Sequence, residues 1–144
     1  MAGKIVVDTS VLIKWIKTKD EELLLEAHRL LNRIEARHLD VHVPALLLYE
    51  AGNILLLKTD LDASSLDAAI DGLEGLPFIV APPAMPLLKR AARVGKQFNL
   101  TFYDASFLAL AVELDCPLVT ADRRFFERTQ SLPRVRHLAK VGNL

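Results

Sequence analysis

The fold of this chain is decided by one stretch near its start, Lys4-Ile5-Val6-Val7-Asp8-Thr9-Ser10-Val11-Leu12-Ile13-Lys14-Trp15-Ile16. Residues 4–7 form a short run rich in β-branched side chains that ends at Asp8, a pattern that predicts a buried strand. Thr9 and Ser10 then offer a helix cap, and apolar side chains recur after them at helical spacing. The stretch therefore predicts a buried strand that leads directly into a helix.

The alternation of strand and helix continues along the rest of the chain. Further strands are predicted at residues 41–43, 78–81, 117–120 and 134–138. Further helices are predicted at residues 21–36, from Pro44 through Leu57, after a cap at Asp62 or Ser64, at residues 86–98 and 101–114, and from Asp122 onward. Such alternation predicts a parallel sheet with helices on both faces. Since no repeat or Gly/Ser linker divides the chain, we expect residues 1–144 to form a single three-layer α/β/α domain with a central, mostly parallel sheet of about four to five strands.

Composition excludes several classes of protein. The chain has 144 residues, of which 51% are hydrophobic, enough for one domain with its own core. Its one cysteine, Cys116, excludes an intramolecular disulfide framework and zinc sites built on several cysteines, and its four histidines show no paired ligand spacing. The first residues lack the apolar core of a signal peptide, and no uncharged apolar run approaches the ~20 residues of a membrane span. We therefore expect a cytoplasmic protein with no membrane partner.

The net charge of zero conceals an uneven distribution. Residues 1–74 carry 8 basic and 13 acidic side chains, a net charge of −5, whereas residues 75–144 carry 10 basic and 5 acidic ones, a net charge of +5. The acids between Asp60 and Glu74 are unrelieved by any base. The overall balance therefore does not exclude a nucleic-acid partner.

Four acidic residues occupy positions that suggest a common site. Asp8 and Asp122 each directly follow a predicted strand, and ligands of open parallel sheets bind outside the carboxyl ends of the strands. Asp104 lies at the start of a helix that packs on the same sheet. Glu50 lies in mid-helix on a mostly apolar face, with no Lys or Arg one turn away, and a buried carboxylate of this kind requires a cationic partner.

Each of these acids also has a purely structural interpretation. Asp8 and Asp122 fit as caps of the helices that follow them, and Asp104 fits as an acid that complements the helix dipole. Glu50 is solvated if the helical phase differs by one residue. These alternatives stay open at the level of single residues. A cluster of three or four carboxylates would suit Mg²⁺ or Mn²⁺, which prefer oxygen ligands, and phosphodiester hydrolysis is the reaction that best fits such a site.

Four motifs follow one another along the whole chain. They are Val7-Asp8-Thr9-Ser10-Val11-Leu12, then Val43-Pro44 through Tyr49-Glu50 with Asn53 following, then Tyr103-Asp104-Ala105-Ser106-Phe107-Leu108-Ala109-Leu110-Ala111, and last Pro117-Leu118-Val119-Thr120-Ala121-Asp122-Arg123-Arg124-Phe125. In their residues they resemble the motifs of PIN-domain ribonucleases. In order, spacing and total length the chain resembles the VapC toxin branch of that family.

The resemblance implies a PIN domain that acts as a metal-dependent endoribonuclease on RNA, usually held inactive by a cognate antitoxin and often a homodimer. By the same resemblance, Asp8, Glu50, Asp104 and Asp122 are the catalytic residues and the ligands of one or two Mg²⁺ or Mn²⁺ ions. Thr9, Asn53 and Thr120 match polar positions beside these acids and are expected to orient them. We expect the apolar faces of the first two helices to supply the dimer interface.

Several alternatives accompany this interpretation. The main one is a non-catalytic PIN-like RNA-binding or scaffold module, which loss of one of the acids would mark, yet all four are present. Basic residues that follow the first and fourth motifs either contact RNA phosphates or are solvated, and they are Lys14, Lys17, Lys19, Arg123 and Arg124. A second basic group on one helix lines the RNA path, faces a partner or is solvated, and it consists of Lys89, Arg90, Arg93 and Lys96. Trp15 either packs in the core or stacks on a base.

Overall fold

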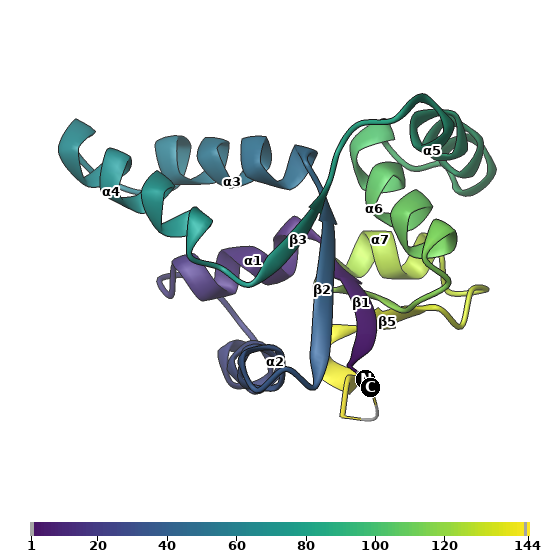
Figure 1. Ribbon diagram of the computed structural model, residues 1–144, viewed down its shortest axis with the longest axis horizontal. Coiled ribbons are helices and arrows are strands. Elements are labelled where there is room, and N and C mark those ends of the chain that lie inside the picture. Colours follow the sequence, from purple (N-terminus) through teal and green to yellow (C-terminus); the bar gives the residue numbers. More distant parts are fainter. Residues whose placement is uncertain (1, 143) are drawn as a thin grey trace.

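A five-stranded parallel sheet forms the centre of the molecule in the computed structural model, which describes residues 2–142 and 144 (Figure 1). The strands are β1 (Gly3–Val7), β2 (Leu39–Pro44), β3 (Phe78–Ala81), β4 (Leu118–Thr120) and β5 (Val135–His137). Their order is β3-β2-β1-β4-β5, and every neighbouring pair is parallel. The predicted parallel sheet is confirmed.

Helices cover both faces of this sheet. They are α1 (Thr9–Ile16), α2 (Leu24–Glu35), α3 (Leu46–Leu57), α4 (Ala63–Glu74), α5 (Met85–Phe98), α6 (Phe102–Glu113) and α7 (Arg123–Arg128), and a 3₁₀ turn follows at Leu138–Lys140. The chain moves from β1 through β2 to β3 in one direction, and right-handed connections place α1 to α4 on one face. It then returns past β1 to β4 and β5, which places α5 to α7 on the other face (Figure 1). The predicted three-layer α/β/α architecture is confirmed.

The direction of winding reverses between β1 and β4. The chain leaves β1 into α1 on one face of the sheet and leaves β4 into α7 on the other. In open α/β sheets the two connections diverge at such a point and leave a crevice at the carboxyl ends of the strands. The topology therefore places a ligand site next to Asp8 and Asp122, the residues that directly follow these two strands.

The core is built from the central strands and from α6. Ile5, Val6 and Val7 of β1 are all buried, as expected for a strand covered on both faces. Residues 105–111 of α6 are also buried without interruption, because α5 covers the side of α6 that the sheet does not. This explains why α6 is apolar all round instead of amphipathic. Cys116 is a buried free thiol.

Two predicted element boundaries are wrong. Pro44 is the last residue of β2, paired with Ala81, and α3 begins at Leu46. Because β1 pairs with β2 only as far as His42, the missing N–H of Pro44 leaves no partner strand unsatisfied. The second helix begins at Leu24 instead of Glu21, because residues 21–23 are irregular and Leu23 has a left-handed φ of 58°.

The helices α3 and α4 extend together away from the sheet (Figure 1). Only Leu73 of α4 is buried, and the acids between Asp60 and Glu74 lie on this helix and the loop before it. Large exposed apolar side chains gather on α3, α4, the loop between them and β3, and they include Leu48, Leu56, Leu57, Leu61, Ile70, Ile79 and Val80. Most apolar residues of α1 and α2 pack inside the chain's own core, whereas Leu25 on α2 is exposed. That these two helices supply a dimer interface stays a prediction. Among the described residues, no helix is both long enough and apolar enough to traverse a bilayer.

Candidate active site

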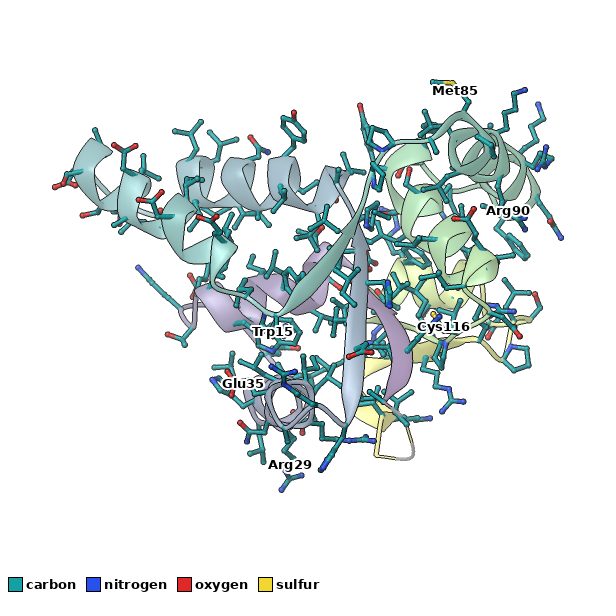
Figure 2. All side chains as sticks on the ribbon, viewed as in Figure 1. Trp15, Arg29, Glu35, Met85, Arg90 and Cys116 are labelled. Carbon is teal, nitrogen blue, oxygen red and sulfur yellow. The ribbon has the colours of Figure 1, made fainter. Side chains whose placement is uncertain are left out.

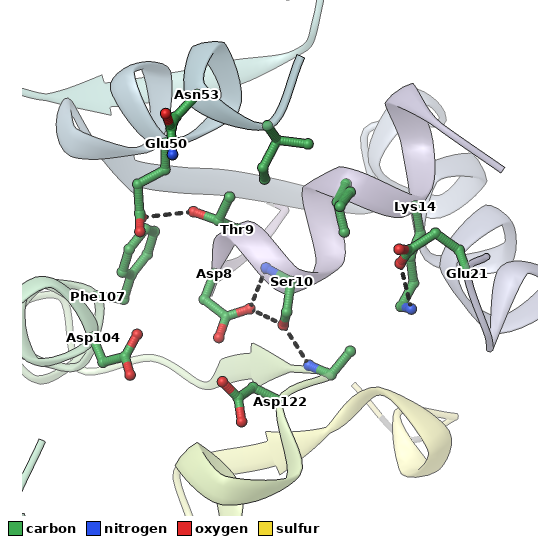
Figure 3. Close-up of a pocket in the computed structure, with 13 residues that line it drawn as sticks. Asp8, Thr9, Ser10, Lys14, Glu21, Glu50, Asn53, Asp104, Phe107 and Asp122 are labelled. Atoms are coloured by element: carbon green, nitrogen blue, oxygen red, sulfur yellow. Dashed lines mark hydrogen bonds and ion pairs between the residues drawn. The ribbon is translucent and has the colours of Figure 1, made fainter. Parts of the chain in front are cut away.

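A pocket of about 510 Å³ opens at the carboxyl ends of β1 and β4, where the winding reverses (Figure 3). All four acids singled out in the sequence line it: Asp8, Glu50, Asp104 and Asp122. They come from four different parts of the chain, namely the end of β1, the middle of α3, the first turn of α6 and the end of β4. The fold thus brings together side chains that are up to 114 positions apart (122 − 8).

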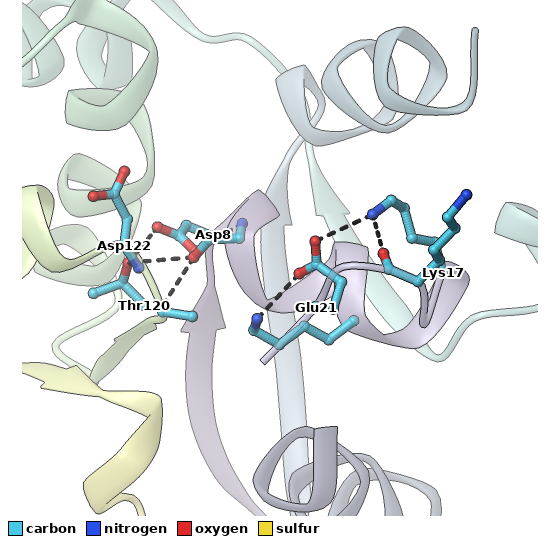
Figure 4. Close-up of polar contacts among 9 residues, drawn as sticks. Asp8, Lys17, Glu21, Thr120 and Asp122 are labelled. Carbon is cyan, nitrogen blue, oxygen red and sulfur yellow. Dashed lines mark hydrogen bonds and ion pairs between the residues drawn. The ribbon is translucent and has the colours of Figure 1, made fainter. Parts of the chain in front are cut away.

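Asp8 is the most buried of the four, with 4% of its surface exposed. Its Oδ1 accepts hydrogen bonds from the backbone N–H of Ser10 (3.1 Å) and from the Ser10 hydroxyl, and its Oδ2 accepts one from Thr120 Oγ1 (2.6 Å) (Figures 3 and 4). Burial raises the pKa of Asp8 from 3.8 to about 7, while the hydrogen bonds from Ser10 and Thr120 oppose this shift. The charges of Asp104 and Asp122 raise the Asp8 pKa further.

Hydrogen bonds tie the loops after β1 and β4 to each other. The Thr120 hydroxyl donates to Asp8 and accepts from the backbone N–H of Asp122 (3.0 Å). The Ser10 hydroxyl accepts from the backbone N–H of Ala121 (2.8 Å) while it donates to Asp8. The predicted orienting position of Thr120 is therefore beside Asp8. Ser10 has an equivalent position that the sequence analysis missed, because an Asp-x-Ser spacing indicates only a local helix cap.

Glu50 and Asp104 face the pocket from opposite faces of the sheet. Glu50 is half-buried on α3, and its Oε1 accepts a hydrogen bond from Thr9 Oγ1 (2.8 Å) (Figure 3). Burial, opposed by this hydrogen bond and reinforced by the Asp104 charge, raises the Glu50 pKa. Burial and then the charge of Asp122 raise the Asp104 pKa. Glu50 is thus neither fully solvated nor in the core but lines the pocket, and Asn53 lines it one turn further along α3.

For Asp8, Asp104 and Asp122 the structural interpretation is also correct. Asp8 caps α1, and Asp122 caps α7 by accepting a hydrogen bond from the backbone N–H of Phe125 (3.1 Å). Asp104 is an acid in the first turn of α6, whose cap is Thr101. One side chain can therefore both cap a helix and line the pocket. Asp122 shows how, because its Oδ1 caps α7 and its second carboxylate oxygen is not used in the cap.

The pocket carries an excess of negative charge. Five acids line it against one base, Lys14, and Lys14 pairs with the fifth acid, Glu21 (3.1 Å), which also pairs with Lys17 (3.4 Å) (Figure 4). Within residues 2–142 and 144, no ion pair involves any of the four acids identified from the sequence. Lys14 is 7% exposed, so it is not a solvated surface residue. The sequence analysis did not predict its pairing with Glu21.

The donor set fits a hard divalent cation, because four carboxylates without a cationic partner line the pocket and such ions prefer oxygen ligands. As the side chains stand, no three acidic, histidine or cysteine residues of the described chain surround one ion position. Asp8 is turned towards Ser10 and Thr120, and Glu50 is turned towards Thr9. Ion binding therefore requires some of these carboxylates to turn towards one another, which a cation would favour by removing their mutual repulsion.

The remaining basic candidates lie at different distances from this pocket. Lys17 and Lys19 line a neighbouring pocket together with Lys58. Arg123 and Arg124 are exposed directly after Asp122, whereas the four basic residues of α5 are not among those that line the site. Figure 2 shows Arg90 projecting from the outer side of α5.

The PIN domain family model matches residues 5–131, a range that contains all four acids. The chain belongs to the PIN domain family. Among curated proteins, this PIN domain is similar to Ribonuclease VapC1 of Mycobacterium tuberculosis, with 35% identity over 86 residues. That alignment covers 58% of this chain and 63% of the relative, so it spans less than two thirds of the relative's length.

Solved structures share the same fold. A Pyrobaculum aerophilum protein has 26% identity and a TM-score of 0.67, and the alignment covers 96% of this PIN domain and 93% of that chain. A toxin–antitoxin complex from Klebsiella pneumoniae contains a chain with 17% identity and a TM-score of 0.69, with 93% and 97% of the two chains covered. The sarcin–ricin-loop-cleaving toxin VapC20 of Mycobacterium tuberculosis has 17% identity and a TM-score of 0.66, with 85% and 93% covered.

Proposed function

We propose that this PIN domain is a metal-dependent endoribonuclease that hydrolyses RNA phosphodiester bonds, and that it is the toxin of a toxin–antitoxin pair. The observation that carries the proposal is the convergence of four carboxylates without cationic partners on one pocket. Membership of the PIN domain family and similarity to a protein named Ribonuclease VapC1 support the same activity.

In this proposal Asp8, Glu50, Asp104 and Asp122 hold one or two Mg²⁺ or Mn²⁺ ions. A divalent ion bound there would supply a water of lowered pKa and would stabilise the negative charge that develops on the phosphate. Thr120 and Ser10 fix the Asp8 carboxylate by hydrogen bonds, and Thr9 fixes that of Glu50. Burial raises the pKa of Glu50 and of Asp104 in the metal-free site, and a bound cation would lower both again because it favours the charged carboxylates.

Cations at the edge of the pocket would receive the RNA backbone. Arg123 and Arg124 are exposed directly after Asp122, whereas Lys14, which lines the pocket, is buried and already paired with Glu21. The charges of the two arginines would offset the repulsion between the acidic pocket and the phosphates on either side of the scissile bond. The acids of α4 are not among the residues that line the pocket, so they do not oppose this approach.

A cognate antitoxin and a second copy of the chain are the proposed protein partners. The structural neighbours include a toxin–antitoxin complex from Klebsiella pneumoniae. The apolar surface on α3, α4 and β3 carries several large exposed side chains, so it is a better candidate for a protein interface than α1 and α2, where most apolar residues are buried and Leu25 is exposed.

The activity is tested by incubating the purified protein with RNA, with Mg²⁺ or Mn²⁺, and with or without a chelator. We expect cleavage only with the free metal, and loss of cleavage in Asp8→Ala and Asp104→Asn. Asp67→Asn on α4, also an exchange of acid for amide, is the matched control and should retain activity. Unchanged cleavage in both pocket variants would exclude the assignment. Mn²⁺ titration separates the enzyme from a non-catalytic module, which has no need to bind the ion.

A further inference from the structure

Two exposed tyrosines stand beside the carboxylates of the pocket. Tyr49 on α3 has 79% of its surface exposed, and Tyr103 on α6 has 61% exposed. Each directly precedes an acid of the candidate active site in the sequence, Glu50 and Asp104 respectively. The helices α3 and α6 approach the pocket from different sides, with Glu50 and Asp104 on either side of the Phe107 ring (Figure 3).

Helix geometry places both tyrosines at the rim of this pocket. Residues four positions apart lie on the same face of a helix, one turn from each other. Tyr49 is therefore one turn before Asn53, and Tyr103 is one turn before Phe107. Asn53 and Phe107 line the pocket. Each tyrosine therefore lies one turn outside the pocket, on the same face of its helix as a residue that lines it.

Packing does not account for the two rings. The Trp15 indole, by contrast, donates a hydrogen bond to the Ala27 carbonyl (2.8 Å) and lies 6.0 Å from the Phe78 ring, which confirms its predicted role in packing. In the described part of the chain, neither of the two aromatic pairs contains Tyr49 or Tyr103. Rings this exposed add little to the stability of the fold, because they bury little apolar surface.

We propose that Tyr49 and Tyr103 stack on the RNA bases that flank the scissile phosphate. This inference rests on the proposed function, since the backbone must cross the acidic pocket between α3 and α6 for its phosphate to react. The adjoining bases then leave the pocket towards its two rims. Aromatic side chains accept any base through its π-face, so the two tyrosines confer affinity for unpaired bases on both sides of the cut with little dependence on sequence.

The proposal is tested by measuring binding of a short, unstructured, fluorescein-labelled RNA by anisotropy. The Asp8→Asn background keeps the RNA intact, so the readout does not depend on cleavage. Alanine at position 49 or 103 should weaken binding roughly five- to a hundred-fold, the range of one lost stack. Tyr49→Phe and Tyr103→Phe should bind like the parent. Phe102→Ala, which removes an aromatic residue that is 43% exposed and lines a different pocket, is the matched control and should also leave binding unchanged.

A strand of ribose and phosphate without bases gives the decisive comparison. The parent should bind it more weakly than RNA, and the alanine variants should lose no further affinity for it. Equal losses on both strands, or no loss on RNA, would overturn the stacking roles while RNA binding itself persists. A lower oligomeric mass of the alanine variants in light scattering would assign the rings to an interface between copies and would also overturn the inference. Absence of RNA binding by the parent would reject the proposed function as well.

Discussion

Asp8 makes the stability of the metal-free protein depend on pH in an unusual direction. Its pKa is about 7 in the fold against 3.8 for the free side chain, a difference of about 3 pH units. One unit corresponds to about 1.36 kcal/mol, so ionisation of the buried Asp8 opposes folding by about 4 kcal/mol. Below about pH 4 both states hold the proton and the penalty is absent. Between about pH 4 and about pH 7 only the unfolded state has lost the Asp8 proton, so the penalty grows through this range. Above about pH 7 the folded state has lost the proton as well, and the full penalty applies.

Asp8→Asn should therefore stabilise the metal-free protein at alkaline pH. Asparagine keeps the shape and one acceptor oxygen of Asp8 but carries no charge. Allowing about 1 kcal/mol for weaker hydrogen bonds with Ser10 and Thr120, we expect a net gain of about 3 kcal/mol. For a domain of this size, that gain corresponds to a rise in Tm of roughly 10 °C at about pH 8.5. At about pH 4 the variant should have no advantage, and it should be slightly less stable.

The measurement is thermal unfolding, followed by circular dichroism in the presence of a chelator, from about pH 4 to about pH 8.5. Asp67→Asn on α4 is the control for removal of an exposed acid and should change the Tm little at any pH. The reasoning is refuted if the difference in Tm between Asp8→Asn and the parent does not grow with pH. It is also refuted if the variant is the less stable protein at the alkaline end.

Three further perturbations test other parts of the site. Mn²⁺ at about a hundred times its Kd should stabilise the parent by about 2.7 kcal/mol in thermal unfolding. Asp104→Asn should lose most of that stabilisation. If Mn²⁺ stabilised the variant and the parent equally, Asp104 would not be a ligand. Thr120→Val should lower the free energy of unfolding by about 1–3 kcal/mol, because Asp8 Oδ2 and the Asp122 N–H each lose the hydrogen bond that Thr120 makes with them. Thr120→Ser should restore the stability, and urea denaturation measures both variants. Glu21→Gln should lower the free energy of unfolding by about 3 kcal/mol, because it breaks the ion pair with buried Lys14. The double variant Lys14→Met and Glu21→Leu should recover part of this stability. If Glu21→Gln were as stable as the parent in urea, the ion pair would have no structural role.

The sequence was sufficient to predict the features that depend on local order. Asp8 and Asp122 follow β-branched runs, and strand ends in a parallel sheet share one edge, so their convergence was predictable. Glu50 was predictable from helical phase, because its neighbours one turn away are apolar. The pair of Lys14 with Glu21 was not, since it depends on the path of the loop between α1 and Glu21, where Asp20 has a left-handed φ of 60° and the Glu21 N–H donates to the Thr18 carbonyl.

The prediction that a helix begins at Pro44 was wrong for a related reason. Proline fits both the first turn of a helix and the end of a strand that lacks a neighbour on one side, and the sequence alone does not distinguish them. The choice depends on where β1 stops pairing with β2, which is a property of the assembled sheet. Errors of this kind shift an element by a few residues without moving Glu50 away from the pocket-facing side of α3.

The energetics of Asp8 connect the fold to the proposed chemistry. A cap of α1 requires only a short polar side chain, and serine or asparagine would cap the helix without placing a charge in the core. A carboxylate at this position raises the free energy of the metal-free fold by about 4 kcal/mol at neutral to alkaline pH, a large part of the stability of an ordinary domain. The surrounding hydrogen bonds from Ser10 and Thr120 reduce that penalty but do not remove it, and no side-chain cation of the described chain pairs with Asp8. A divalent ion bound by the four acids would remove the penalty, and the proposed cation binding would thereby explain a charge that helix capping alone does not require.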